Sequence, residues 1–374
     1  MTIYLFVIFF LLLFIYFYDY KNRRQGDSFA FGLVFSLFVL IPSLSRDMGS
    51  DTLVYQGWFE SLPQLFDFTE NDFTWEPLFC LFMSLLKTIS SEWVVAHTLL
   101  ILFINIPIFY FCKRYVNSKY TFLLIFFLLH FYEVNFEPLR QSCAMAMILW
   151  SLPYLQKKKY IKFYIFSLLS VGFHYTAIVS LFIPLACRFK LCSVKVVITC
   201  MAIFLLSAIL KIYLGNFIDM LSYSLGYTKF DNYQNHDGLN INGVIMTLFI
   251  KILPVFAAMY VCIKKGILKD SQLLNGLAIM FVIFMVGRTF VPIFERFTLM
   301  FSFAQTACYA DAIIGRVKSP CLNTMAKRSN TWLLLISTYI FLAFVYNVKS
   351  YLGAVNQFDE PNITRCVPYK SILD

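Results

Sequence analysis

The sequence predicts an all-α membrane protein, a polytopic transmembrane helical bundle with about 12 crossings. Of its 374 residues, 60% are hydrophobic and 14% are charged, against about 45–50% and about 25% in an ordinary soluble domain. Apolar runs of about 17–25 residues, the length that a helix needs to cross a bilayer, recur from end to end. No polar stretch between them is long enough to fold alone, so we expect residues 1–374 to form one integral membrane domain.

Thirteen apolar segments are candidate helices. The chain should cross the membrane once between the second segment and the basic loop at Lys113, yet two segments lie there. We therefore interpret residues 75–90, the shorter of the two, as a re-entrant or half-membrane helix, which is tolerated where its backbone is buried in protein. The segments are 2–18, 28–44, 75–90, 94–111, 120–134, 141–155, 160–173, 175–187, 194–213, 243–262, 273–290, 297–314 and 331–346.

The net charge of +10 comes from short basic clusters between the apolar runs. Such clusters do not form the continuous basic face of a nucleic-acid-binding protein. By the positive-inside rule they indicate cytoplasmic loops, with the N-terminus outside. The first apolar segment lacks a basic start and a small-residue cleavage site, so we expect no cleaved signal peptide. The clusters are Lys21/Arg23/Arg24, Lys113/Arg114/Lys119, Lys157/Lys158/Lys159/Lys162, Arg188/Lys190/Lys195, Lys264/Lys265/Lys269 and Arg316/Lys318/Lys327/Arg328.

This orientation leaves three long elements on the outer face, at about 45–74, 214–242 and 347–374. All three are rich in Tyr, Asp, Asn and aromatic residues. That composition suits contact with sugars, whose hydroxyls need polar partners and whose apolar faces rest on aromatic rings. It also suits an ordinary loop at a membrane surface, and composition does not decide between the two.

The first candidate site is the segment RDMGSDTLVY at the outer end of the second helix, with Arg46, Asp47, Asp51 and Tyr55. Ionisable groups at a membrane edge are costly and usually face a cavity. An arginine with two carboxylates suits an anion site beside a general base, or alternatively an interfacial salt bridge. The position of Gly49 and the acidic spacing favour a functional loop.

Two more candidates lie at predicted helix ends. Arg140 precedes a helix start, where it would form a phosphate-binding corner or pair with Glu137 across one turn. His174 and Tyr175 join two helices on the same outer face. A lone histidine in an apolar setting is commonly structural, but its expected place near Arg46 and Arg140 makes it a candidate general base.

The last candidate is GRTFVPIFERF, with Arg288, Glu295 and Arg296 in or beside a short outer loop. The two arginines could clamp a phosphate, or each could extend to the lipid headgroups. No P-loop, dinucleotide fingerprint, zinc signature or nucleophile elbow is present, and the ten cysteines form no CxxC pair. We expect no cofactor, no metal site and no disulfide framework.

The order of motifs resembles that of the EpsG family of bacterial polysaccharide polymerases, which overlaps the Wzy-type O-antigen polymerases. The resemblance spans nearly the whole chain. Seven polar residues match the family's recurrent positions: Arg46, Asp51, Tyr55, Glu76, Arg140, His174 and Arg296. The motifs are RDMGSDTLVYQGWFE, WEPLF, LRQSCAMAMILW, YLQKKKYIKFYIFSLLSVGFHYTAI, FERFTLMF and VPYKSIL.

The resemblance implies a glycosyltransferase of the bacterial inner membrane whose active site faces the periplasm. It would join oligosaccharide repeat units carried on undecaprenyl pyrophosphate, with membrane lipid around it and a chain-length regulator as a partner. Arg140, Arg288 and Arg296 would hold the donor pyrophosphate, and Asp51 or His174 would deprotonate the acceptor. Arg46, Tyr55 and Glu76 would bind substrate. The alternatives are an O-antigen ligase that uses the same donor, and a flippase for the same lipid-linked units, although the sequence has no internal repeat of the transporter kind.

Overall fold

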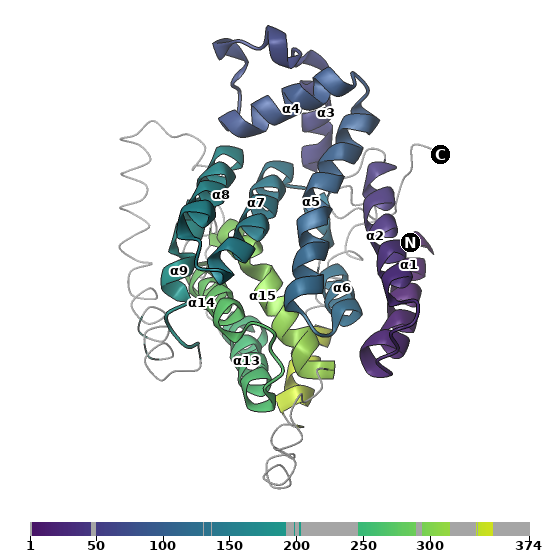
Figure 1. The fold of residues 1–374 in the computed structure, drawn as a ribbon, viewed down its shortest axis with the longest axis vertical. Coiled ribbons are helices and arrows are strands. Elements are labelled where there is room, and N and C mark those ends of the chain that lie inside the picture. Colours follow the sequence, from purple (N-terminus) through teal and green to yellow (C-terminus); the bar gives the residue numbers. More distant parts are fainter. Residues whose placement is uncertain are drawn as a thin grey trace. The chain divides into compact units, whose positions relative to one another are not determined.

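The computed structural model describes residues 2–45, 50–129, 131–135, 137–191, 246–288, 294–314 and 336–346, with positions 198, 202 and 334. All regular structure in these ranges is helical (Figure 1), which confirms the all-α prediction. The chain divides into two compact units. Unit 1 comprises Met1–Leu181 with Val348–Asp374, and unit 2 comprises Phe182–Asn347. That the two units form one membrane domain stays a prediction.

Unit 1 contains a series of helices joined by short turns. They are α1 (Thr2–Phe14), η1 (Ile15–Tyr20), α2 (Asp27–Ser43), α3 (Ser50–Ser61), η2 (Leu65–Asp67), η3 (Glu70–Asp72), α4 (Pro77–Ile89), α5 (Trp93–Tyr115), α6 (Lys119–Leu128), η4 (Phe131–Asn135), α7 (Leu139–Gln156), α8 (Tyr160–Phe173) and η5 (Tyr175–Phe182).

Unit 2 begins at the last residue of η5. Its described helices are α9 (Ile183–Ala186), η7 (Thr247–Ile252), α13 (Leu253–Lys265), α14 (Ser271–Arg288), α15 (Phe294–Ile314) and a further helix at Ile336–Tyr346. Gly266 ends α13 in the left-handed conformation that glycine adopts without strain. The helices α14 and α15 pack along each other, with Phe284 of α14 stacked on Phe301 of α15 at 5.8 Å.

The predicted apolar segments coincide with described helices, except for 194–213, of which the structure describes only positions 198 and 202. Among the described residues, five helical stretches are long and apolar enough to cross a membrane: Ile3–Tyr20, Trp93–Tyr115, Thr247–Lys265, Ser271–Arg288 and Arg296–Ile314. Other apolar helices are shorter, so about 12 crossings is not confirmed. The helix α4 has 13 residues, roughly 20 Å at about 1.5 Å per residue, which is too short to span hydrocarbon of about 30 Å. Its re-entrant placement stays a prediction.

The outer element predicted over 45–74 contains a helix, α3, that apolar run length did not identify. Its buried residues follow a helical spacing: Thr52, Tyr55 and Phe59 of α3, and Leu62 directly after it, are all under 7% exposed. Steps of three and four residues place these side chains on one face. The predicted outer elements at 214–242 and 347–374 lie outside the described residues.

The helix α7 forms the centre of unit 1. Residues Leu139 to Leu155 are buried around almost its whole circumference, as expected for a helix that packs on all sides. Small side chains such as Ser142, Ala144 and Ala146 let α5 and α8 approach closely. The N-terminus of α7 is therefore held firmly against its neighbours.

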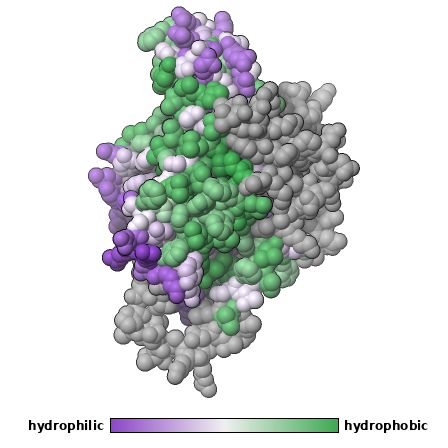
Figure 2. Space-filling model, turned by 90° about the vertical axis from the view of Figure 1, so that its right-hand side faces the viewer, coloured by the Kyte–Doolittle hydropathy of each residue, from purple (hydrophilic) through white to green (hydrophobic). Residues whose placement is uncertain are grey.

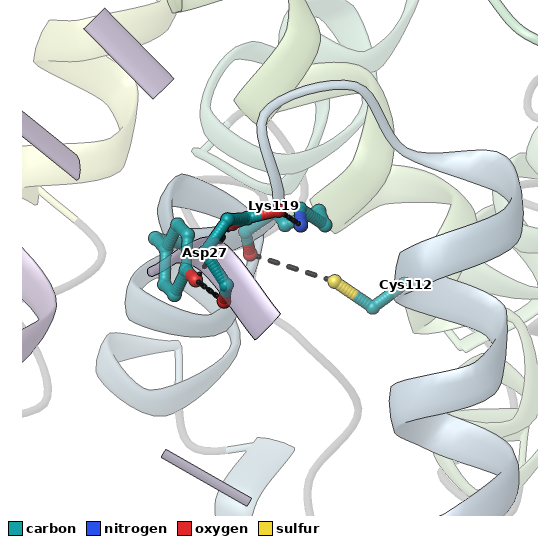
Figure 3. A network of polar contacts seen from close by, with 4 residues as sticks. Asp27, Cys112 and Lys119 are labelled. Atoms are coloured by element: carbon teal, nitrogen blue, oxygen red, sulfur yellow. Dashed lines mark hydrogen bonds and ion pairs between the residues drawn. The ribbon is translucent and has the colours of Figure 1, made fainter. Parts of the chain in front are cut away.

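A polar network joins the ends of α2, α6 and their loops (Figure 3). The Lys119 ammonium donates to Asp27 Oδ2 at 2.7 Å, and the Tyr120 hydroxyl donates to Asp27 Oδ1 at 2.9 Å. Arg114 at the end of α5 donates to Gln156 at the end of α7 at 2.6 Å. These contacts gather the first three basic clusters at one end of unit 1. The other end of α5, a 23-residue helix, lies roughly 35 Å away.

Several helices carry exposed apolar side chains that no described residue covers. In unit 1 they include Phe6 and Phe9 on α1 and Ile161 and Leu168 on α8, each more than half exposed. Figure 2 shows hydrophobic residues spread over a broad area of the face in view. Lipid is the solvent in which such surfaces are stable, so the structure supports a multi-pass membrane protein.

Candidate functional site

Four polar side chains from four helices of unit 1 meet in one hydrogen-bonded cluster. The Arg140 guanidinium donates through Nη1 to Glu76 Oε2 at 2.6 Å and through Nε to the Tyr55 hydroxyl at 3.0 Å. The other carboxylate oxygen of Glu76 lies 2.5 Å from His174 Nδ1. Glu76 and Tyr55 are each 3% exposed. We call these four residues the Arg140 cluster.

Three members of the Arg140 cluster lie at helix ends. Glu76 immediately precedes α4, whose first residue is Pro77, and proline is favoured there because its missing N–H is not needed. Arg140 lies in the first turn of α7, after Pro138. His174 ends α8, and its backbone N–H donates to the Ser170 carbonyl. Helix ends place these polar groups at the boundary of the apolar bundle.

A glycine allows the helices α4 and α8 to pack close together. A Cβ added to Gly172 on α8 would lie 2.9 Å from the Leu78 Cβ on α4. Real Cβ atoms essentially never come so close, so only glycine permits this separation. The approach brings His174, two residues after Gly172, within hydrogen-bond distance of Glu76, two residues before Leu78.

Aromatic rings form one wall of the Arg140 cluster. The Arg140 guanidinium carbon lies 5.1 Å from the centroid of the Trp75 ring, a distance suited to a cation–π contact. Tyr55 meets the same ring edge-on, with ring centroids 4.8 Å apart, and Trp58 packs against the Trp75 ring with centroids 4.4 Å apart. Sequence reasoning did not select Trp75 or Trp58. The signal was available, because Trp75 stands directly before Glu76 in the motif WEPLF.

Electrostatics fix the charge of Glu76. Burial raises the pKa of this carboxyl, but the hydrogen bond with His174 and the positive charge of Arg140 outweigh it and lower the pKa from 4.5 to about 2. The carboxylate is therefore ionised near neutral pH and can only accept hydrogen bonds. His174 Nδ1 must then be the donor in the contact with Glu76.

The second ring nitrogen of His174, Nε2, is the atom that could accept a proton from a substrate. With Nδ1 protonated, a neutral imidazole carries its lone pair on Nε2. His174 is 8% exposed, and its Nε2 has no hydrogen-bond partner within the described part of the chain. A carboxylate that orients a histidine, with the far nitrogen available, is the arrangement of a general base.

The Arg140 cluster lies at the end of unit 1 away from the basic loops. Phe59 of α3, one turn after Tyr55, packs against Trp93 at the start of α5, with ring centroids 5.5 Å apart. The basic loops gather at the other end of α5, near Arg114. The prediction that the polar residues and the basic clusters occupy opposite ends therefore agrees with the geometry of unit 1.

The structure brings together four of the predicted site residues: Tyr55, Glu76, Arg140 and His174. The partner found for Arg140 is Glu76, 64 positions away in the sequence, which local spacing could not identify. Among the other predicted residues, Arg46 lies outside the described residues, and Asp51 is described only as backbone of α3. Arg288 and Arg296 lie in unit 2, at the neighbouring ends of α14 and α15.

Comparison with known proteins agrees with the resemblance seen in the motifs. The family model described as EpsG family matches residues 28–371. No curated protein and no solved structure matches the chain. The family match covers nearly the whole chain and includes every residue of the Arg140 cluster. The chain belongs to the EpsG family, a family of Wzy-like polymerases.

Proposed function

We propose that this chain polymerises oligosaccharide repeat units carried on undecaprenyl pyrophosphate into O-antigen or a related surface polysaccharide. The observation that carries the proposal is the contact of Glu76 with both His174 and Arg140, because it places a candidate base beside a candidate anion site. The family match supports the reaction class. An activated lipid-linked donor needs neither ATP nor a sugar nucleotide.

His174 acts as the general base in this proposal. Its Nε2 takes the proton from the acceptor hydroxyl, whose oxygen forms a bond to the anomeric carbon of the donor sugar. The bond from that carbon to the pyrophosphate oxygen breaks, and undecaprenyl pyrophosphate leaves with the electron pair. Glu76 holds the His174 tautomer and stabilises the imidazolium that forms. Asp51, at the start of α3, is the second candidate base.

Arg140 stabilises the departing pyrophosphate. Its bonds to Tyr55 and Glu76 use two of the five N–H donors that a guanidinium carries. The side chain is 26% exposed, so part of it is accessible. Charge-assisted hydrogen bonds to a developing oxyanion are among the strongest contributions to catalysis. That Arg288 and Arg296 hold pyrophosphate, and that Arg46 binds substrate, stay predictions from the sequence.

The periplasmic face is the proposed location of the reaction. Three basic clusters gather at the end of unit 1 opposite the Arg140 cluster, and basic loops remain in the cytoplasm. The Arg140 cluster then opens toward the periplasmic side of the inner membrane. Lipid-linked repeat units would reach it from the outer leaflet of that membrane.

A genetic complementation experiment tests the proposal. A strain lacking the chain is complemented with wild type, Arg140→Ala, His174→Gln or Arg24→Ala, and the surface polysaccharide is separated on a gel. Arg24 is an exposed arginine in the basic loop and serves as the matched control. The amount of each protein in the membrane is measured in parallel.

The proposal expects Arg140→Ala and His174→Gln to lose the polymer ladder and retain single repeat units, while Arg24→Ala keeps the ladder. An unchanged ladder in both site variants would overturn the site. Loss of every band, single units included, would instead indicate a ligase or a flippase.

A further inference from the structure

A cavity lies on the face of α3 that does not contact Arg140. It has a volume of about 570 Å³, within the range of roughly 300–1,000 Å³ that ligand pockets occupy. It shares no lining residue with the Arg140 cluster. Its lining comes from the end of α2, from α3 and from the start of α5, and consists of Ser43, Ser45, Thr52, Leu53, Gln56, Glu60, Ser91, Glu92, Trp93, Val94 and His97.

The described lining suits a neutral ligand with many hydroxyl groups. It offers four hydroxyl side chains, the Gln56 amide and the carboxylates of Glu60 and Glu92, and none of its residues is Lys or Arg. Carboxylates accept hydrogen bonds from sugar hydroxyls and repel phosphate. Trp93 adds an aromatic ring, the surface on which the apolar face of a sugar rests.

Two buried polar atoms of this lining have no partner in the described part of the chain, Ser43 Oγ and His97 Nε2. Ser43 is 3% exposed and His97 is 1% exposed. The His97 ring is held in place by stacking on Trp93, with centroids 5.1 Å apart and an interplanar angle of 11°. A buried polar group without a partner is unfavourable, so these two residues leave hydrogen-bonding capacity unused at the wall of the cavity.

The helix α3 separates two chemically different sites. Tyr55 contacts Arg140, whereas Leu53, Gln56 and Glu60, which are spaced three and four residues apart, line the cavity. Successive residues of a helix are about 100° apart, so the neighbours Tyr55 and Gln56 point in different directions. One side of α3 faces Arg140 of α7, which suits an anion, and the other faces a cavity whose acidic and hydroxyl groups suit an uncharged polyol.

We propose that the cavity formed by α2, α3 and α5 is a saccharide subsite that binds a neutral sugar segment of the lipid-linked oligosaccharide. This inference rests on the proposed function and adds that two parts of the substrate bind at two separate sites. The sugar is held by the cavity on one side of α3, and the pyrophosphate by the Arg140 cluster on the other.

The test measures binding by the full-length protein in detergent, with no reaction taking place. The probes are the phosphate-free repeat-unit oligosaccharide released from the host's polysaccharide, and inorganic pyrophosphate. The cavity variant is Gln56→Ala/Glu60→Ala, two changes near the exposed rim of the cavity. The matched control, Gln64→Ala/Glu70→Ala, removes the same residue types at exposed positions outside the cavity.

The subsite predicts that the cavity variant loses saccharide affinity by about tenfold or more, because it removes two polar partners, and keeps pyrophosphate affinity. The control variant should keep both affinities. Equal saccharide binding by the cavity variant and wild type, or no saccharide binding by wild type, overturns the subsite and indicates that water fills the cavity. Neither result shows whether the protein polymerises repeat units. The polymer ladder of the His174→Gln strain tests that separately.

Discussion

The carboxylate of Glu76 contacts Arg140 with one oxygen and His174 with the other. This residue therefore holds both the proposed base, His174, and the proposed anion-binding residue, Arg140. Replacing it by an isosteric amide keeps the shape but removes the charge that Arg140 requires. Breaking a buried ion pair costs about 3–5 kcal/mol, and because Arg140 is 26% exposed we expect about 2 kcal/mol for Glu76→Gln.

The pH dependence of stability is the test of that charge. The folded pKa of Glu76 is about 2, below the ordinary 4.5. Its ionisation therefore contributes stability that is fully present above about pH 4.5 and is lost as the pH falls toward about 2. Thermal unfolding in detergent should show the gap between wild type and Glu76→Gln shrinking over that window. A gap that stays constant from pH 7 to pH 2.5 would contradict the assignment.

Tyr55→Phe removes one oxygen from the Arg140 cluster. The Arg140 Nε donor loses its acceptor while the ring of Tyr55 keeps its packing on Trp75. We expect a loss of about 1–3 kcal/mol in the free energy of unfolding. Tyr16→Phe, which changes a tyrosine that is 50% exposed, should leave the unfolding temperature unchanged. Equal unfolding temperatures for Tyr55→Phe and wild type would show that the hydrogen bond is not formed.

At the scale of helices, the contact of α4 with α8 determines whether Glu76 reaches His174. Gly172→Ala introduces a Cβ at 2.9 Å from the Leu78 Cβ, so the two helices must separate. Overpacking of this kind costs about 1–3 kcal/mol. Polymer length should fall together with stability, because the Glu76 to His174 hydrogen bond lengthens.

The control for this prediction is Gly32→Ala on α2. Nothing lies within 4 Å of a Cβ added there, and alanine is the better helix former by about 1 kcal/mol. Gly32→Ala should therefore keep wild-type polymer length and equal or higher stability. A Gly172→Ala protein that is as active and stable as Gly32→Ala would show that α4 and α8 do not pack closely.

At the scale of the whole molecule, the prediction concerns orientation in the membrane. An epitope tag inserted after Asn71, between α3 and α4, should bind antibody on intact spheroplasts. A tag after Lys158, between α7 and α8, should bind only after permeabilisation, because the basic loops remain in the cytoplasm. The reverse pattern would place the Arg140 cluster on the cytoplasmic side and would exclude a periplasmic reaction.

The sequence by itself determined the all-α class, the positions of the apolar helices and the family. The first two depend on the length and composition of continuous segments, because lipid requires each crossing to satisfy its own backbone hydrogen bonds. The motifs also selected Tyr55, Glu76, Arg140 and His174 as site residues. Their order in the chain, however, carries no information about which of them touch.

Only the tertiary structure decided those contacts. Arg140 pairs with Glu76, a partner that local spacing in the sequence does not identify. Trp75 forms the wall of the Arg140 cluster, and the helix α3 occupies a segment that was expected to be a loop. The cavity of α2, α3 and α5 was not predicted at all. Each of these features joins segments that are distant in the sequence, and they meet only because the helices pack in one arrangement that local periodicity does not specify.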